Sequence, residues 1–427
     1  MKLLPHQVET YKFLKKTKKC LVLSEMGTGK SLPALKLLVE IASLGGKCLY
    51  ICPAFLVHNV GAEIEKFFKG TKYQILTSPK KDGWGEANII IMSYNRMKVT
   101  PQLFKEVTAV VFDEVHKLCS TESAVTNKAH EYTDNAKNLK YLVGMTGTPL
   151  MNRVGELYPL MALCDHTGKF VSIFKSQFNF CMQIQYHRIE NKYGRRVHTF
   201  EGIKKKKVLL AWLQALSIRH TLAQIGKLPN CEYMEIRVKG SKKSEKILEK
   251  AWRRFKEVSQ SDAEHFEESY SAKKSFFAYE KTPETIEFVK GLLEETEEHI
   301  LVLSDHRKAA MKIAEAFNSE CILGGLQLEA RFKIVDQFQK GELGRILCGT
   351  IGALGVGLNL TKASIVVFND AAWTPAANRQ AIGRILRLNQ EKDCRVYNIV
   401  ANEVDSRVTM LNMQKQDLIG ETVEKIN

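Results

Sequence analysis

The sequence is poor in the features that identify membrane, secreted or zinc-binding proteins. Its apolar runs are too short to span a bilayer, and Met1–Gln7 contains no apolar core of a signal peptide. The ten cysteines are scattered singly; the closest pair is Cys48 and Cys52, and no Cys-x-x-Cys motif occurs. We therefore expect a cytoplasmic protein in a reducing compartment, with no disulfide framework, zinc site or membrane partner.

Acidic residues are in deficit. The chain has 63 Lys+Arg against 47 Asp+Glu, a formal net charge of +16. This excess favours a polyanionic partner such as nucleic acid over a small acidic substrate, although a basic surface can also serve solubility alone. The hydrophobic fraction of 44% is that of a globular protein, and 427 residues are too many for one core, so we expect at least two domains.

The stretch Leu21–Ser31 has the pattern of a phosphate-binding loop. The apolar run Cys20–Leu23 predicts a buried strand, and the pattern after the glycines predicts a helix that begins at Ser31. The first glycine of the usual Gly-x-x-x-x-Gly-Lys-Ser motif is replaced by Ser24. An ordinary strand-turn-helix therefore stays open as the alternative.

The residue types in this loop suit a nucleotide. Gly27 and Gly29 let backbone N–H groups turn toward a phosphate, and Lys30 supplies a charge for the β- and γ-phosphates. Ser31 would hold Mg²⁺. The amide of Gln7 could pair with an adenine edge, or be an exposed helix cap. The predicted ATP-binding residues are Gln7, Met26, Gly27, Thr28, Gly29, Lys30 and Ser31.

A pair of carboxylates follows a second apolar strand, in Ala109–His116. Asp113 can hold Mg²⁺ through water, and Glu114 can orient the water that attacks the γ-phosphate. The alternative is an acidic cap at a helix N-terminus. A third strand ends at Met145–Leu150, where the Thr146 and Thr148 hydroxyls are either a relay from the hydrolysis site or a simple turn.

Apolar runs alternate with helical patterns along most of the chain. This alternation predicts βαβ units, an α/β fold and parallel sheets with functional loops at their carboxyl edges. The expected strands include Lys47–Cys52, Asn88–Met92, His299–Ser304, Arg345–Thr350 and Ser364–Asn369.

Three motifs together resemble those of superfamily-two helicases and translocases: Gly27–Ser31, Asp113–His116 and Thr146–Pro149. The chain is similar to the Swi/Snf-type subgroup in Ser24–Ser31, in Thr146–Asn152 with Glu156-Leu157, and in Ser217–His220 with Leu228-Pro229. The compact annealing-helicase and fork-remodelling members look most similar.

This resemblance implies two RecA-like lobes, each a mostly parallel sheet flanked by helices. The expected domains are a first ATPase lobe at 1–168, a mainly helical, basic insertion at 169–281 and a second lobe at 282–427. The run Lys204–Lys207 lies in the insertion, where it either faces nucleic acid or is a solvated surface. No second phosphate loop occurs, so the second lobe is predicted to be a partner of the first.

The resemblance also assigns roles in the second lobe. Gly357 belongs to a glycine-rich motif that couples the lobes, and it is expected to join the ATP-binding residues. Gln380–Arg387 is the last motif. Arg384 and Arg387 are three residues apart and are expected on one helix face, as catalytic arginines. The chain departs from the subgroup at Thr374, Gly383, Leu386 and Leu388-Asn389.

Further residues receive roles from the resemblance alone. Ser93, Ser304 and Thr350 are implied phosphate contacts, and Trp373 is either a base-stacking residue or part of the core. The implied coupling residues are His116, Thr146, Thr148 and Gln380.

We expect a monomeric, ATP- and Mg²⁺-dependent translocase or helicase that acts on double-stranded or forked DNA without sequence specificity. A strand-separating DNA or RNA helicase is the first alternative. The second is an ATP-gated nucleic-acid clamp with little motor activity.

Overall fold

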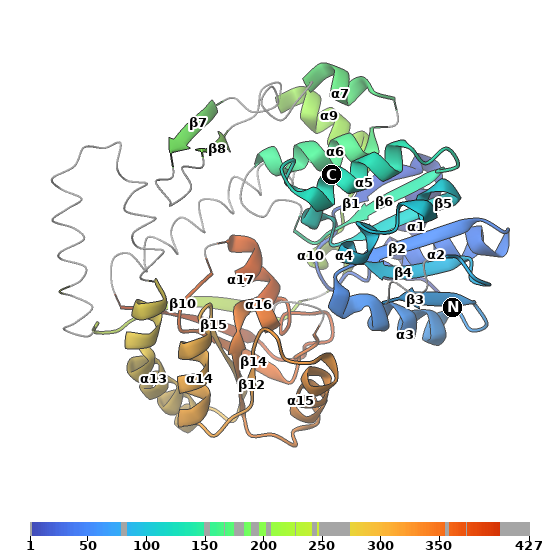
Figure 1. The fold of residues 1–427 in the computed structure, drawn as a ribbon. Coiled ribbons are helices and arrows are strands. Elements are labelled where there is room, and N and C mark those ends of the chain that lie inside the picture. Colours follow the sequence, from blue (N-terminus) through green and yellow to red (C-terminus); the bar gives the residue numbers. More distant parts are fainter. Residues whose placement is uncertain are drawn as a thin grey trace. The chain divides into compact units, whose positions relative to one another are not determined.

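Two units make up the part of the chain that the computed structural model describes (Figure 1). The boundary between them falls between Gly226 and Lys227, inside the range 169–281. The predicted domain limits themselves stay a prediction. The described residues are 2–77, 83–148, 154–165, 167–174, 183–188, 196–201, 206–226, 228–240, 246, 274–354, 358–372 and 374–401.

Unit 1 is built on a seven-stranded sheet with the order β3-β4-β2-β5-β6-β1-β9. Every neighbouring pair in it is parallel. The strands are β1 (Lys19–Val22), β2 (Lys47–Cys52), β3 (Tyr73–Leu76), β4 (Ile89–Ser93), β5 (Val107–Asp113), β6 (Tyr141–Met145) and β9 (Ser217–Ile218). The predicted strand Lys47–Cys52 is confirmed with the same bounds.

Helices cover both faces of this sheet. One face packs against α1 (Pro5–Thr17), α2 (Ser31–Ser43) and α3 (Val57–Phe67). The other packs against α5 (Ala124–Asp134), α6 (Leu157–Cys164) and α9 (Lys206–Leu216). The shorter helices are α4 (Tyr94–Met97), α7 (Lys169–Phe174), α10 (Leu222–Ile225), and the 3-10 turns η1 (Ala54–Leu56), η2 (Pro101–Lys105), η3 (Val115–Leu118) and η4 (Val154–Glu156).

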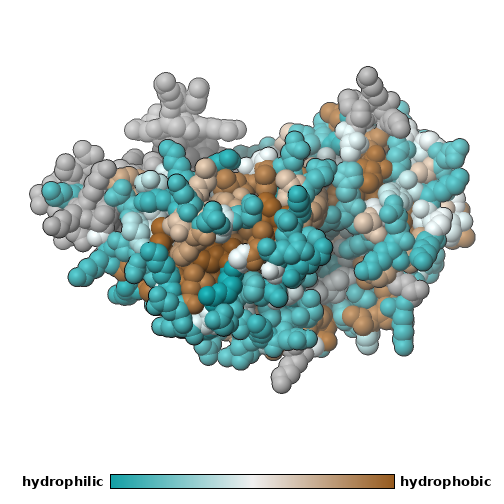
Figure 2. All heavy atoms as spheres, turned by 90° about the horizontal axis from the view of Figure 1, so that it is seen from below, coloured by the Kyte–Doolittle hydropathy of each residue, from teal (hydrophilic) through white to brown (hydrophobic). Residues whose placement is uncertain are grey.

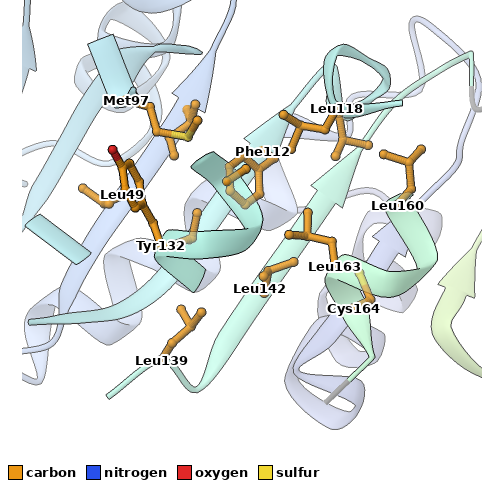
Figure 3. Close-up of a cluster of buried hydrophobic side chains, with 14 of the residues drawn as sticks. Leu49, Met97, Phe112, Leu118, Tyr132, Leu139, Leu142, Leu160, Leu163 and Cys164 are labelled. Carbon is orange, nitrogen blue, oxygen red and sulfur yellow. The ribbon is translucent and has the colours of Figure 1, made fainter. Parts of the chain in front are cut away.

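The central strand β5 shows why its sequence is a continuous apolar run. Val111 belongs to the core on one face, and Phe112 to the core on the other. Alternate side chains of a strand point to opposite faces, so a strand covered on both sides needs apolar residues at every position. Phe112 lies among apolar side chains such as Leu142 and Leu163 (Figure 3). This packing fixes the strand that ends at Asp113.

Unit 2 repeats this architecture with a six-stranded parallel sheet of order β10-β15-β14-β11-β13-β12. Its strands are β10 (Cys231–Arg237), β11 (His299–Ser304), β12 (Cys321–Ile322), β13 (Ile346–Thr350), β14 (Ala363–Phe368) and β15 (Cys394–Val400). Its helices are α13 (Thr282–Glu295), α14 (Arg307–Ala316), α15 (Leu328–Lys340), α16 (Ile351–Leu354) and α17 (Pro375–Ile382). The α/β fold with two parallel sheets is therefore confirmed.

The predicted insertion also contains strands in its described parts. β7 (Gln183–Arg188) and β8 (Arg196–Glu201) form an antiparallel pair, while β9 and β10 join the sheets of units 1 and 2 respectively. The prediction of a mainly helical insertion came from the resemblance, which does not specify how short strands of this particular chain pair.

Hydrophilic residues predominate on the face of the molecule in Figure 2, around patches of apolar residues. Large exposed apolar side chains in the described residues include Leu44 at 83% and Tyr233 at 61% exposure. Among the described helices we find none with the length and apolar character that a bilayer-spanning helix requires.

Candidate active site

The register of three neighbouring strands in unit 1 brings the predicted ATP-site segments together. Met145 at the end of β6 is paired with Val22 of β1 on one side and with Asp113 of β5 on the other. The loop after β1, the Asp113-Glu114 pair and the Thr146 turn therefore leave the sheet side by side at its carboxyl edge. Ligands of open parallel sheets bind at such an edge.

The loop after β1 has the backbone that its glycines predict. Gly27 and Gly29 have φ values of 81° and 74°, in the left-handed region that favours glycine. Helix α2 begins at Ser31, as predicted. The Lys30 ammonium donates a hydrogen bond to the Glu25 carbonyl oxygen at 2.9 Å, so it lies over the loop where a phosphate would bind.

Helix α1 packs directly against this loop through two side chains. The Gln7 amide nitrogen lies 3.3 Å from the Gly29 carbonyl oxygen, and the Gln7 amide oxygen accepts a hydrogen bond from Leu4 N. A His6 ring nitrogen is 2.8 Å from the Thr28 carbonyl oxygen. Gln7 is 5% exposed, so its amide is committed to the protein backbone here, and the role with adenine stays a prediction.

The Thr146 turn approaches the loop so closely that only glycine fits between them. A Cβ on Gly147 would lie 2.4 Å from the Met26 side chain and 3.4 Å from the Lys30 ammonium nitrogen. A glycine in a Thr-Gly-Thr-Pro turn is expected for the turn itself, so the sequence alone assigns Gly147 no further role. The structure shows that it also makes room for the nucleotide loop.

Asp113 is buried and held by two tyrosines. The Tyr50 hydroxyl donates to Asp113 Oδ2 at 2.9 Å, and the Tyr94 hydroxyl donates to the Asp113 carbonyl oxygen at 2.9 Å. Burial raises the pKa of Asp113 to about 6, and the neighbouring Glu114 carboxylate is the second cause of the increase. A cation beside a buried carboxylate of this kind stabilises its charged form.

Glu114 takes a backbone conformation that few non-glycine residues adopt. Its φ is 55°, at a cost on the order of 1 kcal/mol. The turned side chain places Glu114 Oε2 3.2 Å from His116 Nδ1, and Thr146 Oγ1 lies 3.0 Å from the same His116 nitrogen. Thr148 N donates to Thr146 Oγ1 at 3.0 Å. The predicted coupling residues of unit 1 thus form one hydrogen-bonded group with Glu114.

The donor set suits Mg²⁺. Ser31 offers a hydroxyl and Asp113 a carboxylate, both hard oxygen ligands of the kind that Mg²⁺ prefers. Each Asp113 oxygen accepts one hydrogen bond, from Tyr50 or from Glu114 N, and keeps a second lone pair. The residues present therefore fit the metal.

The prediction that Arg384 and Arg387 lie on a helix is wrong. Helix α17 ends at Ile382, because Gly383 and the following turns close the segment with short-range backbone bonds such as Arg384 N to the Ala381 carbonyl. The two arginines still converge. Arg384 Nη1 and Arg387 Nη2 donate to one acceptor, the Leu358 carbonyl oxygen, at 3.1 and 2.8 Å.

The two arginines differ in burial. Arg384 is 4% exposed, while Arg387 is half-buried and donates from Nε to the Gly383 carbonyl oxygen at 2.9 Å. Burial lowers the pKa of Arg387 below its ordinary value. In this state both guanidinium groups are held by backbone of their own unit.

The implied phosphate contacts occupy strand ends in their own units. Ser93 caps α4 by accepting a hydrogen bond from Arg96 N at 3.2 Å, and Thr350 ends β13. Ser304 is fully buried and donates a hydrogen bond to Asp370. Gln380 lies in α17. Gly357 and Trp373 lie outside the described residues.

Sequence reasoning missed Tyr50, Tyr94, His6, Glu25 and Asp370, which hold the predicted residues in place. Asp370 and Tyr94 carried a signal, because Asp370 directly follows the predicted strand Ser364–Asn369 and Tyr94 comes two residues after the predicted strand Asn88–Met92. The other three become partners of the site through contacts that spacing along the chain does not reveal.

With this geometry established, similarity to known proteins identifies the chain's relatives. The SNF2-related domain matches residues 6–294, and the helicase conserved C-terminal domain matches residues 284–389. The chain belongs to the SNF2-related family. The two matched domains together indicate ATPase activity.

Two curated relatives illustrate the family. An "uncharacterized ATP-dependent helicase" of Mycoplasma pneumoniae is 26% identical over 432 residues, covering 94% of this chain and 40% of the relative. A Caenorhabditis elegans homologue of SWI/SNF-related matrix-associated actin-dependent regulator of chromatin subfamily A-like protein 1 is 25% identical over 445 residues, covering 98% and 62%. The chain thus spans about two fifths to three fifths of the length of these relatives.

A solved structure is also similar over most of its length. It is the Sulfolobus solfataricus SWI2/SNF2 ATPase core in complex with dsDNA, with 19% identity, a TM-score of 0.44, and coverage of 99% of this chain and 93% of that one. A TM-score below 0.5 is too low to transfer function.

Proposed function

We propose that this SNF2-related chain is a DNA-stimulated ATPase that couples ATP hydrolysis to movement along double-stranded or forked DNA. The observation that carries the proposal is the convergence of the Gly27–Ser31 loop, Asp113-Glu114 and the Thr146 turn at one sheet edge. The net charge of +16 supports a nucleic-acid partner, and contacts to phosphates would carry no sequence information.

In this proposal the residues of unit 1 divide the work of hydrolysis. The loop N–H groups and Lys30 bind the phosphates, and Ser31 with Asp113 would hold Mg²⁺, which when bound neutralises charge on the β- and γ-phosphates. Glu114 positions the attacking water, and its carboxylate is oriented for this by His116 and Thr146. Arg384 and Arg387 would supply the positive charge that the transferring phosphoryl group requires.

The test is the steady-state ATPase rate of the full chain with different nucleic acids at one low salt concentration. The set contains no nucleic acid, single-stranded DNA, blunt duplex DNA, forked DNA and duplex RNA. The largest stimulation by duplex or forked DNA supports the proposal. Stimulation by single strands or RNA alone would replace it with a strand-separating helicase, and equal rates throughout would replace it with an ATP-gated clamp.

A further inference from the structure

Glu25 is the residue at which the nucleotide loop meets a distant part of unit 1. Its carbonyl oxygen accepts hydrogen bonds from Thr28 Oγ1 at 2.8 Å and from the Lys30 ammonium at 2.9 Å. Its own N–H donates to the His220 carbonyl oxygen at 2.9 Å. The backbone of one residue therefore contacts both the phosphate-binding lysine and a residue nearly 200 positions further along the chain.

The side chain of Glu25 strengthens this connection. Leu222 N donates to Glu25 Oε2 at 2.8 Å, and Arg219 Nη2 lies 3.8 Å from Glu25 Oε1. The neighbouring residue Ser24, 2% exposed, accepts a hydrogen bond from His220 N at 2.9 Å. The ion pair is long and partly exposed, so the hydrogen bond to Leu222 is the stronger link.

We call Ser217–Leu222 the return segment, because it brings the chain back to the nucleotide loop. Its first two residues form β9 and pair with Leu21 and Val22 of β1. Its last residue begins α10, which ends one residue before the boundary of unit 1 at Gly226. The chain that continues into unit 2 is therefore anchored on the strand and loop that carry the nucleotide site.

Nucleotide binding bears on this anchor through Lys30. A phosphate at the loop would share the Lys30 ammonium, which has three N–H donors, with the Glu25 carbonyl oxygen, so we expect the bond between Lys30 and Glu25 to change. The loop is also held more tightly when the ligand is bound, since a ligand stabilises the conformation that it selects. Both effects reach the return segment through Glu25.

We propose that Glu25 is a positioning residue that transmits nucleotide occupancy from the loop to the return segment. Its carboxylate orients Leu222 through the hydrogen bond from Leu222 N, and its carbonyl oxygen responds to the position of the Lys30 ammonium. The proposal rests on the proposed function in one respect only, that ATP is the nucleotide bound.

Hydrogen exchange of the return segment tests this directly and requires no hydrolysis. The amides of residues 219–222 in the return segment, and those that follow as far as Gly226, are compared with and without a non-hydrolysable ATP analogue plus Mg²⁺, with binding of the analogue verified separately. In the unaltered protein the analogue slows their exchange by at least about threefold, within a ceiling of about 100-fold at a ligand concentration of 100 Kd.

Three substitutions separate the carboxylate, its charge and its partner. Glu25→Ala removes the acceptor and abolishes the response. Glu25→Gln keeps an oxygen that can accept a hydrogen bond from Leu222 N, so this variant retains the response. Leu222→Pro removes the donor and keeps the backbone conformation, since proline suits the first position of α10 and Thr221 before it is already extended. It also replaces a side chain that is 7% exposed, and it too abolishes the response.

Glu106→Ala is the matched control, because Glu106 is an exposed glutamate of unit 1 outside this network, and it responds as the unaltered protein does. An unchanged response in both Glu25→Ala and Leu222→Pro overturns the proposal, as does an absent response in the unaltered protein with analogue bound. If Glu25→Ala fails to bind the analogue, Leu222→Pro decides. Lack of DNA stimulation would remove the proposed function but leave this exchange result standing.

Discussion

Asp113 shows how one side chain can be prepared for a cation by its surroundings. It ends a buried strand, accepts a hydrogen bond from Tyr50 and lies beside a second carboxylate, Glu114. Lys30 is the nearby positive group that lowers its pKa, and it does not offset burial. The site without its ligands is therefore electrostatically unfavourable, and ATP with Mg²⁺ would relieve that cost.

The raised pKa of Asp113 predicts a pH-dependent stability. The folded-state pKa of about 6 lies above the ordinary value of 3.8, so this group contributes stability below about pH 4 that is lost as pH rises through 6. Asp113→Asn does not titrate. The free energy of unfolding of the unaltered protein should therefore fall relative to the variant by about 2 kcal/mol between pH 4 and 7.

Denaturant titrations of both ligand-free proteins across this pH range measure the difference. A difference in unfolding free energy that stays constant with pH would show that Asp113 has an ordinary pKa in the folded protein.

Glu114→Gln is expected to separate nucleotide binding from hydrolysis. The amide keeps the size of the side chain and an oxygen for Thr146, but it has no negative charge with which to polarise water. We expect kcat to fall by about 10²- to 10⁴-fold while the Kd for ATP changes by less than about threefold. Glu106→Gln serves as the control, and substantial turnover in Glu114→Gln would remove Glu114 from its role.

At the scale of elements, the loop between β1 and α2 depends on close approach as well as on backbone freedom. Gly29 has a positive φ, and a Cβ on it would lie 2.5 Å from the Gln7 amide nitrogen. Gly45, after α2, has a similar φ of 85° with nothing within 4 Å of such a Cβ. Both glycines therefore have a backbone conformation that would strain another residue, but only at Gly29 would an added Cβ collide with a neighbouring side chain.

This pair predicts different outcomes for the same substitution. Gly45→Ala should lower the unfolding free energy by about 1 kcal/mol and leave ATP binding unchanged. Gly29→Ala should add displacement of Gln7 from the loop and raise the Kd for ATP by about tenfold or more, because the loop N–H groups move. Fluorescent-nucleotide titration and thermal unfolding measure both, and equal Kd values for the two variants would contradict the role of crowding.

At the scale of the whole molecule, charge is the property that bears on the partner. A net charge of +16 favours association with DNA through its phosphates, and such contacts release counterions. ATP binding at a site formed by one loop and two strand ends should depend much less on salt. The two ligands therefore respond differently to ionic strength.

We expect the apparent affinity for duplex DNA, taken from half-maximal ATPase stimulation, to fall by about 10²-fold or more between 50 and 200 mM salt, as for a protein with several phosphate contacts. The Kd for ATP without DNA should change by less than about threefold. A DNA affinity that is insensitive to salt would argue against phosphate contacts as the main source of binding.

Local patterns were sufficient for much of this protein. The strand Lys47–Cys52 and the strand His299–Ser304 follow from continuous apolar runs, and both have the predicted bounds. The helix start at Ser31 and the positive φ of Gly27 follow from residue types a few positions apart. Such features depend on steric and hydrophobic preferences of neighbouring residues, which the sequence contains directly.

Contacts between distant residues settled the rest. Tyr50 reaches Asp113 across 63 positions, and Glu25 reaches Leu222 across 197. Helix α17 ends at Ile382, so Arg384 and Arg387 do not lie on the helix that their spacing predicted. They converge because both donate hydrogen bonds to the Leu358 carbonyl oxygen. Burial, register and shared acceptors arise when the sheets assemble, so no local pattern could specify them.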